Sequence, residues 1–85
     1  MVNQHILDDF KNVDVSDLKM PIISVFYNTA DIPMKYSARL FEFNRPTNVV
    51  VIKDTLEEIR NVIPSNLTRM DRQSNDHPTV VEVWL

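Results

Sequence analysis

The sequence predicts a small α+β domain in which one main helix packs on one face of an antiparallel or mixed four-stranded sheet. Three observations support this fold class. Four short segments rich in β-branched and aromatic residues are typical of strands, one segment places its apolar residues at helical spacing, and all five prolines fall between such segments. We expect a single domain over residues 20–85, preceded by a helix or arm over residues 1–19, because 85 residues suffice for one hydrophobic core.

Residues 1–19 have the least regular pattern in the chain. Ile6, Phe10 and Val13 recur at helical spacing, which predicts a short amphipathic helix over residues 4–12 that covers the sheet. A free arm is the alternative. The segment carries four aspartates and no apolar run, the opposite of a secretory signal peptide, and this favours a cytoplasmic protein.

Three strands are predicted in close succession. Ile22–Tyr27 is largely apolar on both faces, as expected for a central strand that is buried on two sides. Tyr36–Asn44 follows a loop over residues 28–35, and Asn48–Lys53 follows a turn at residues 45–47. The short connection between the second and third strands predicts that they are antiparallel neighbours.

The main helix has the clearest local signal. Asp54 is the predicted N-cap, Glu57 completes a capping box three residues later, and the acidic first turn suits the helix dipole. Pro64 ends the helix. We expect the apolar face of this helix to pack on the sheet; its residues are Leu56, Ile59 and Ile63.

The last part of the chain completes the predicted sheet. Residues 65–77 are polar and predict an ordered loop or a short strand, and Thr79–Leu85 predicts the fourth strand. A right-handed crossover would place this strand parallel to the first and beside it, in the order third, second, first, fourth. The third strand would then be an apolar edge that invites pairing with another chain, which predicts a homodimer. The candidate interface residues are Val49, Val51 and Trp84.

The chain contains no glycine and no cysteine. Without glycine it cannot form a phosphate-cradling loop, a dinucleotide fingerprint or a serine nucleophile elbow. Without cysteine it has no disulfide and no thiolate metal site, which favours a reducing cytoplasm. We predict no metal site and no cofactor, because the two histidines have no ligand-spaced companions.

Asparagine is the residue that most readily replaces glycine at positive φ. Several asparagines lie in predicted loops or at the ends of predicted elements. The candidates for positive φ are Asn28, Asn44, Asn48, Asn66 and Asn75.

Candidate ligand-binding residues surround the loop between the first two predicted strands. An acid, an amine and a phenol at one rim can bind a small polar ligand or transfer protons. The alternative is an ordinary solvated loop, and we assign no catalytic residue. The candidates are Tyr27, Asp31, Lys35, Tyr36 and Arg39.

A nucleic-acid site is a further alternative. Arg39, Phe41 and Phe43 alternate along one predicted strand and so share a face, as in platforms that bind single strands. The candidate contacts are Arg39, Arg45, Arg69 and Arg72. We prefer the interpretation that buries both phenylalanines in the core under the helix, and the net charge of −3 argues mildly against nucleic acid.

From Met20 onward the chain resembles a family of short bacterial and phage-associated proteins whose function is not known. The phrases that carry the resemblance are VFYNTADIPMKYSARLFEF, PTNVVVIKDTLEEIRNVIP, LTRMDR and DHPTVVEVWL. The family pattern has Pro-Lys-Tyr where this chain has Met34 between Pro33 and Lys35. The resemblance implies a bacterial cytoplasmic setting and no particular activity.

These patterns together favour a non-enzymatic protein-interaction or regulatory module whose partner is another protein or a second copy. A small-ligand-binding protein or enzyme and a nucleic-acid-binding protein are the alternatives. Convergence of Asp31 and Lys35 would favour a ligand, and exposure of both Phe41 and Phe43 would favour nucleic acid. An apolar patch or strand edge would favour a protein partner.

Overall fold

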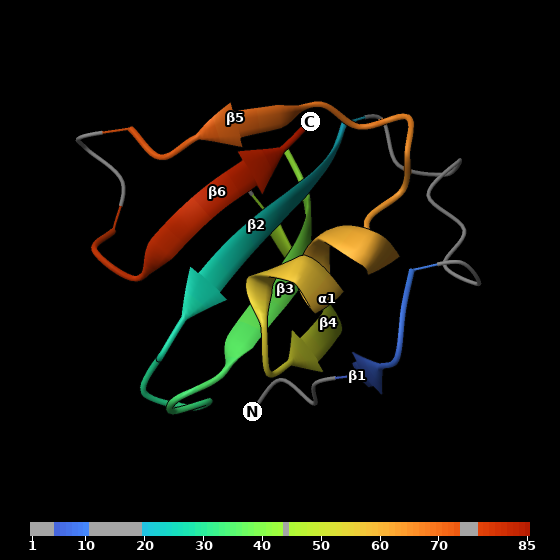
Figure 1. Cartoon of the computed structure of the whole chain (residues 1–85). Helices are drawn as coiled ribbons and strands as arrows, with labels where there is room; N and C mark the ends of the chain where they lie inside the picture. The colour runs from blue at the N-terminus through green and yellow to red at the C-terminus, as the bar shows by residue number, and fades with distance from the viewer. Residues whose placement is uncertain (1–4, 11–19, 44, 74–76) are drawn as a thin grey trace.

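The computed structural model describes residues 5–10, 20–43, 45–73 and 77–85. In this part of the chain, six strands form one mixed sheet and one short helix lies against it (Figure 1). The elements are β1 (His5–Leu7), β2 (Pro21–Tyr27), β3 (Tyr36–Glu42), β4 (Arg45–Lys53), α1 (Leu56–Val62), β5 (Arg69–Asp71) and β6 (Val80–Trp84). The predicted α+β class is confirmed, but the sheet has six strands where the sequence predicted four.

The strand order is β1-β4-β3-β2-β6-β5. The central strands β2, β3 and β4 form an antiparallel meander, β1 lies parallel to β4, and β6 and β5 continue the sheet beyond β2. The order predicted for the four expected strands is correct, but the direction of the last one is wrong, because β6 runs antiparallel to β2. This direction results from β5, a strand that was not predicted and that lies between α1 and β6 in the sequence. Because β5 and β6 pair antiparallel, the chain changes direction before it enters β6.

The prediction that β4 is an edge strand is wrong. β1 pairs along it, with His5 opposite Val49 and Leu7 opposite Val51, and Val51 is fully buried. The helix predicted for residues 4–12 is also wrong where it includes residues 5–7, which are extended; residues 4, 11 and 12 lie outside the described part. A strand forms there because the backbone N–H and C=O groups along the edge of β4 can hydrogen-bond to it. The sequence did not predict this, because three apolar positions are too few to distinguish a helix from a strand.

The core lies between α1 and one face of the sheet (Figure 1). Ile59 of α1 and Ile63, the residue that follows α1, pack against alternate residues of the central strands. The buried cluster is formed by Phe10, Ile23, Val25, Ala38, Leu40, Val51, Ile59 and Ile63. The predicted placement of Phe41 and Phe43 in this core is wrong. Phe41 alternates with Leu40 and so lies on the other face, and Phe43 lies past the end of β3 and is 61% exposed.

Local chemistry sets the bounds of α1. Thr55 is the N-cap, and not Asp54 as predicted: its Oγ1 accepts a hydrogen bond from the backbone N–H of Glu58 at 3.2 Å and donates to the Glu58 carboxylate at 3.0 Å. The capping pair is therefore shifted by one residue from the predicted Asp54 and Glu57. The helix ends at Val62, two residues before Pro64, as the proline predicts.

Within the described part of the chain, three residues adopt the positive φ that glycine would normally supply. Asn28 has φ 57°, as predicted, and its Oδ1 accepts a hydrogen bond from the backbone N–H of Met34 at 2.8 Å. Met34 at 62° and Phe43 at 56° were not predicted. Among the other candidates, Asn48 and Asn66 do not have positive φ. Asn44 and Asn75 lie outside the described residues.

Candidate functional site

The loop residues predicted to bind a ligand form two separate ion pairs. Arg39 Nη2 donates to Asp31 Oδ2 at 2.5 Å. Lys35 instead pairs with Asp54, just after β4, and the hydrogen bond and charge of Lys35 lower the pKa of the Asp54 carboxyl. Asp31 and Lys35 thus bind different partners and do not converge on one point.

Tyr27 and Tyr36 contact each other across the β2–β3 ladder. Their ring centroids lie 4.7 Å apart, and the ring planes are inclined by 47°. Side-chain alternation places both residues on the α1 side of the sheet, where Tyr36 packs on the core, and places Arg39 on the opposite side. The five predicted ligand residues are therefore divided between the two faces.

The arginines predicted to contact nucleic acid are divided in the same way. Arg39 points away from α1, whereas Arg69 is paired with Trp84 and lies on the α1 side. Arg69 forms an ion pair with Asp71 at 3.2 Å, and Arg45 lies 3.8 Å from Glu42. Arg72 is exposed just after β5. The four arginines do not form one continuous basic surface.

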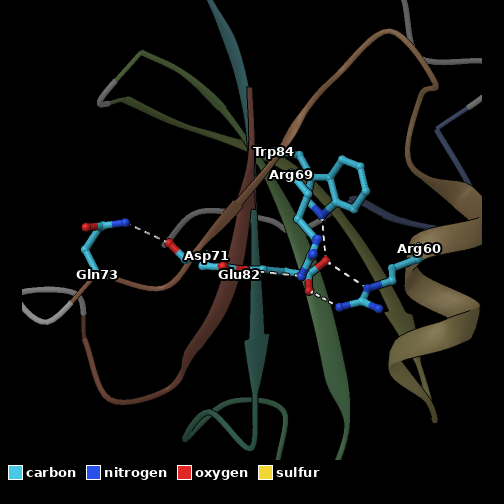
Figure 2. A network of polar contacts seen from close by, with 6 residues as sticks. All are labelled: Arg60, Arg69, Asp71, Gln73, Glu82 and Trp84. Carbon is cyan, nitrogen blue, oxygen red and sulfur yellow. Dashed lines mark hydrogen bonds and ion pairs between the residues drawn. The ribbon is translucent and has the colours of Figure 1, made fainter.

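A buried carboxylate, that of Glu82 on β6, is held by side chains of α1 and β6 (Figure 2). Glu82 is 2% exposed. Arg60 donates to it from Nε at 3.2 Å and from Nη2 at 2.7 Å, and Trp84 donates from Nε1 at 2.7 Å. Burial by itself raises the pKa of Glu82, but the hydrogen bonds from Arg60 and Trp84, together with the positive charges of Arg60 and Arg69, outweigh it and hold the pKa below its ordinary value. Glu82 is therefore charged at neutral pH.

This arrangement is a structural clamp. Both oxygens of Glu82 already accept hydrogen bonds, and Arg60 joins α1, which packs on β3 and β4, to the more distant strand β6. Trp84, which the sequence suggested as an interface residue, instead directs its indole N–H to Glu82. The sequence signal for the clamp was Glu82 itself, the single charged residue in an otherwise apolar strand.

The face of the sheet opposite α1 has no helix on it in the described structure, and we call it the open face. One row of paired residues crosses all six strands on this face. It runs through Ile6, Val50, Arg39, Ser24, Val83 and Met70. The ends of the row are exposed, Ile6 by 62% and Met70 by 45%. Half-buried apolar residues flank the row on both sides, namely Ile22 and Phe41 on one side and Phe26 and Ile52 on the other.

Arg39 is the one charged side chain within this row, and its charge is balanced locally. Its guanidinium carbon lies 5.9 Å from the centroid of the Phe26 ring, within the range of a cation–π contact, and it pairs with Asp31. Because Asp31 belongs to the loop over residues 28–35, this contact draws the loop toward the open face. The row is therefore apolar apart from Ser24 and an internally neutralised arginine.

Ser37 lies next to the row, between Phe26 and Ile52 in the register. It is fully buried, and its Oγ has no hydrogen-bond partner. A hydroxyl in this position costs free energy, because it loses its water without gaining a partner.

No protein-family model matches the chain, and no curated protein or solved structure is significantly similar to it. Among the described residues, none of the helical structure is long and apolar enough to cross a membrane. The same part of the chain contains no group of three histidine, cysteine, aspartate or glutamate side chains placed to hold a metal ion.

Proposed function

We propose that this protein is a non-enzymatic protein-interaction module that binds its partner through the open face. The exposed apolar residues at the two ends of the row on this face, Ile6 and Met70, support this most directly, because exposed apolar surface marks interaction sites. The row extends from one edge of the sheet to the other. Its ends are exposed, whereas Val50 within it is 1% exposed, so a partner would contact chiefly the ends and the half-buried residues beside the row.

The dimensions of the layers also support a partner. A sheet with apolar residues on both faces needs a covering layer on each. Six strands at about 4.8 Å spacing span about 24 Å, whereas the seven residues of α1 are about 10 Å long. Within the described residues the helix covers part of one face and no second helix covers the other, where Val50 and Ser37 are nevertheless buried and the residues around them are half-buried.

The two alternatives receive less support from the site. A small polar ligand would need Asp31 and Lys35 together, and each is paired elsewhere. Nucleic acid would need cations in register with successive phosphates, and Arg39, Arg45 and Arg69 each have an acidic neighbour. Phe43 is exposed, but Phe41 is half-buried.

Site-specific photo-cross-linking in cells of the natural host tests the proposal. A photoreactive phenylalanine analogue is placed at position 22 or 83 on the open face, and at Asn61 on the exposed surface of α1 as the control. We expect covalent adducts to the same one or few proteins from both open-face positions and none from position 61. Equal adducts at all three positions, or none at any, would contradict the proposal.

We place this function in the bacterial cytoplasm. The absence of cysteine from the sequence and the resemblance of residues 20–85 to short bacterial proteins support that setting. Fractionation of host cells, followed by immunodetection of the chain, checks it.

A further inference from the structure

We propose that the loop over residues 28–35, which we call the strap, closes over one end of the open face and opens while the sheet stays folded. Opening would expose Phe26 and Ser37, which lie beside the apolar row. In that respect the inference rests on the proposed function, because these residues would enlarge the surface offered to a partner. The opening itself is a property of the chain alone.

One ion pair and one buried side chain hold the strap in place. Arg39 Nη2 donates to Asp31 Oδ2 at 2.5 Å, and the Arg39 guanidinium carbon lies 5.9 Å from the centroid of the Phe26 ring. Ile32, next to Asp31, is 8% exposed but does not belong to the buried cluster under α1. The strap therefore buries its apolar residue outside the main core, where β2 ends and β3 begins.

Ser37 lies at this end of the open face, paired with Phe26 on β2 and with Ile52 on β4. It is fully buried although both of these neighbours are only half-buried. We attribute its burial to the strap, because Asp31 is bound to Arg39, two residues farther along the same face of β3. Closing the strap removes water from the Ser37 hydroxyl, which has no hydrogen-bond partner, and this costs free energy that the open state avoids.

Hydrogen bonds allow the tip of the strap to move as one piece. At the base, the backbone N–H of Asn28 donates to the Lys35 carbonyl at 3.0 Å, and Asn28 Oδ1 accepts from the N–H of Met34 at 2.8 Å. At the tip, the N–H of Ile32 donates to the Thr29 carbonyl at 3.2 Å. None of these bonds joins the strap to the open face. Opening therefore leaves the strap's base and the β2–β3 ladder intact.

The contacts that hold the strap are weak. The Asp31 side chain is 49% exposed, and an ion pair this accessible to water contributes little. The gain from burying Ile32 is opposed by the cost of burying the Ser37 hydroxyl. Because these contributions are of similar size, we expect the strap to be open in about 0.1–10% of the molecules. Opening should then be far more frequent than global unfolding.

Thiol labelling of the purified full chain with iodoacetamide tests the inference. The chain has no cysteine, so one introduced thiol reports one position. Ser37→Cys and Val25→Cys both place a thiol at a fully buried position, but Val25 belongs to the cluster under α1. Asn61→Cys, on the exposed surface of α1, gives the rate of an accessible thiol.

Ser37→Cys should react about 10- to 1,000-fold more slowly than Asn61→Cys, in proportion to the open fraction. Urea below the unfolding transition should hardly change this rate, since opening the strap exposes little surface. Val25→Cys should react more slowly still, and its rate should rise steeply with urea, because its exposure requires global unfolding. Equal rates at positions 37 and 25, or the same dependence on urea, would overturn the inference.

The Asp31–Arg39 ion pair offers a matched comparison in the Ser37→Cys chain. Asp31→Asn removes the charge that holds the strap and should speed labelling by about two- to fivefold. Asp71→Asn makes the same change in the ion pair with Arg69 on β5 and should leave the rate unchanged. Iodoacetamide is uncharged, so neither substitution alters its approach. The same effect from both substitutions, or no effect from either, would contradict the strap.

A thiol on the strap itself keeps Ser37 unchanged and serves if Ser37→Cys does not fold. Ile32→Cys should label faster than Val25→Cys and with little dependence on urea. Adding Ser37→Ala removes the buried hydroxyl, which favours the closed strap, and should slow this labelling by about fivefold. Labelling that Ser37→Ala leaves unchanged or makes faster would refute the inference.

The strap and the proposed function can fail separately, because labelling of the purified chain needs no partner. If position 37 labels only through global unfolding while positions 22 and 83 still form adducts in cells, the strap is wrong and the interaction module stands. If the strap opens but no adduct forms in cells, the proposed function is wrong and the strap stands.

Discussion

Arg60→Met is expected to destabilise the fold by about 2 kcal/mol, because it leaves the buried Glu82 carboxylate without its main partner. Removing one member of a fully buried ion pair costs about 3–5 kcal/mol. The cost here should be lower, since Arg60 is 42% exposed and Glu82 keeps its hydrogen bond from Trp84. Methionine retains an unbranched apolar side chain, so the change tests the guanidinium.

The loss is large for a chain of this size. At about 0.05–0.15 kcal/mol per residue, the 85 residues have a total stability of about 4–13 kcal/mol. A loss of about 2 kcal/mol should lower Tm by about 8–16 °C. Urea unfolding at pH 7, followed by far-ultraviolet circular dichroism and by the emission of the single tryptophan, measures the change. The control is Arg45→Met, which removes an arginine that is 80% exposed and should cost less than about 0.5 kcal/mol.

The pH dependence gives the same experiment a second readout. In the native protein the pKa of Glu82 lies below its ordinary value of 4.5, so its stabilising contribution is present above that pH and is lost as the pH falls through the folded-state pKa. Without Arg60, burial should raise the pKa of Glu82 instead. The variant would then bind a proton more readily when folded than when unfolded. The deficit in its free energy of unfolding, relative to the unsubstituted protein, should therefore be smaller at pH 4 than at pH 7. A deficit no larger than that of Arg45→Met, or one that does not change with pH, would refute this reasoning.

Four further substitutions test three local features. Thr55→Ala should cost about 1 kcal/mol by removing the N-cap of α1, whereas Asp54→Ala should leave the helix unaffected; thermal unfolding of the two variants compares them directly. Ser37→Ala should raise stability by about 1 kcal/mol in urea unfolding, because the buried Oγ has no partner, and a decrease would show that it has one. Met34→Gly should raise stability by about 0.5–1 kcal/mol, since the side chain is 72% exposed and φ is 62°; an unchanged or lower Tm would mean that the backbone there is not strained.

The central strands and the helix could be predicted from the sequence because their signals are local. β2, β3 and β4 are seven to nine residues long and rich in β-branched and aromatic residues, and Pro64 marks the end of α1. The N-cap was misplaced by one residue because Asp54 and Thr55 are both good capping residues and each has a glutamate three positions later.

The outer strands could not be predicted in the same way. β1 and β5 have three residues each, too few for a periodic pattern, and they are extended because β4 and β6 offer them hydrogen bonds. Missing β5 also gave the wrong direction for β6. The short length of these two strands is itself an ordinary way to limit pairing at sheet edges.

The candidate site was predicted less well than the fold. Residue type alone does not determine which ion pairs the loop residues form. The loop conformation decides that Asp31 pairs with Arg39 and that Lys35 pairs with Asp54. The open face was visible only indirectly, in the apolar residues on both faces of Ile22–Tyr27. Which of those faces the helix covers depends on the whole sheet.

The order of strands in the sheet has a consequence for how the chain folds. The meander from β2 to β4 is continuous in sequence, whereas β1 joins β4, and β6 joins β2, across most of the chain. The entropy cost of closing a long loop opposes such distant contacts until the central strands have formed. We therefore expect the meander to form first and the outer strands to be added to both of its sides. Amide hydrogens should then exchange most slowly in β3 and most rapidly in β1 and β5. Partial opening would begin at the two edges and leave the middle of the sheet intact.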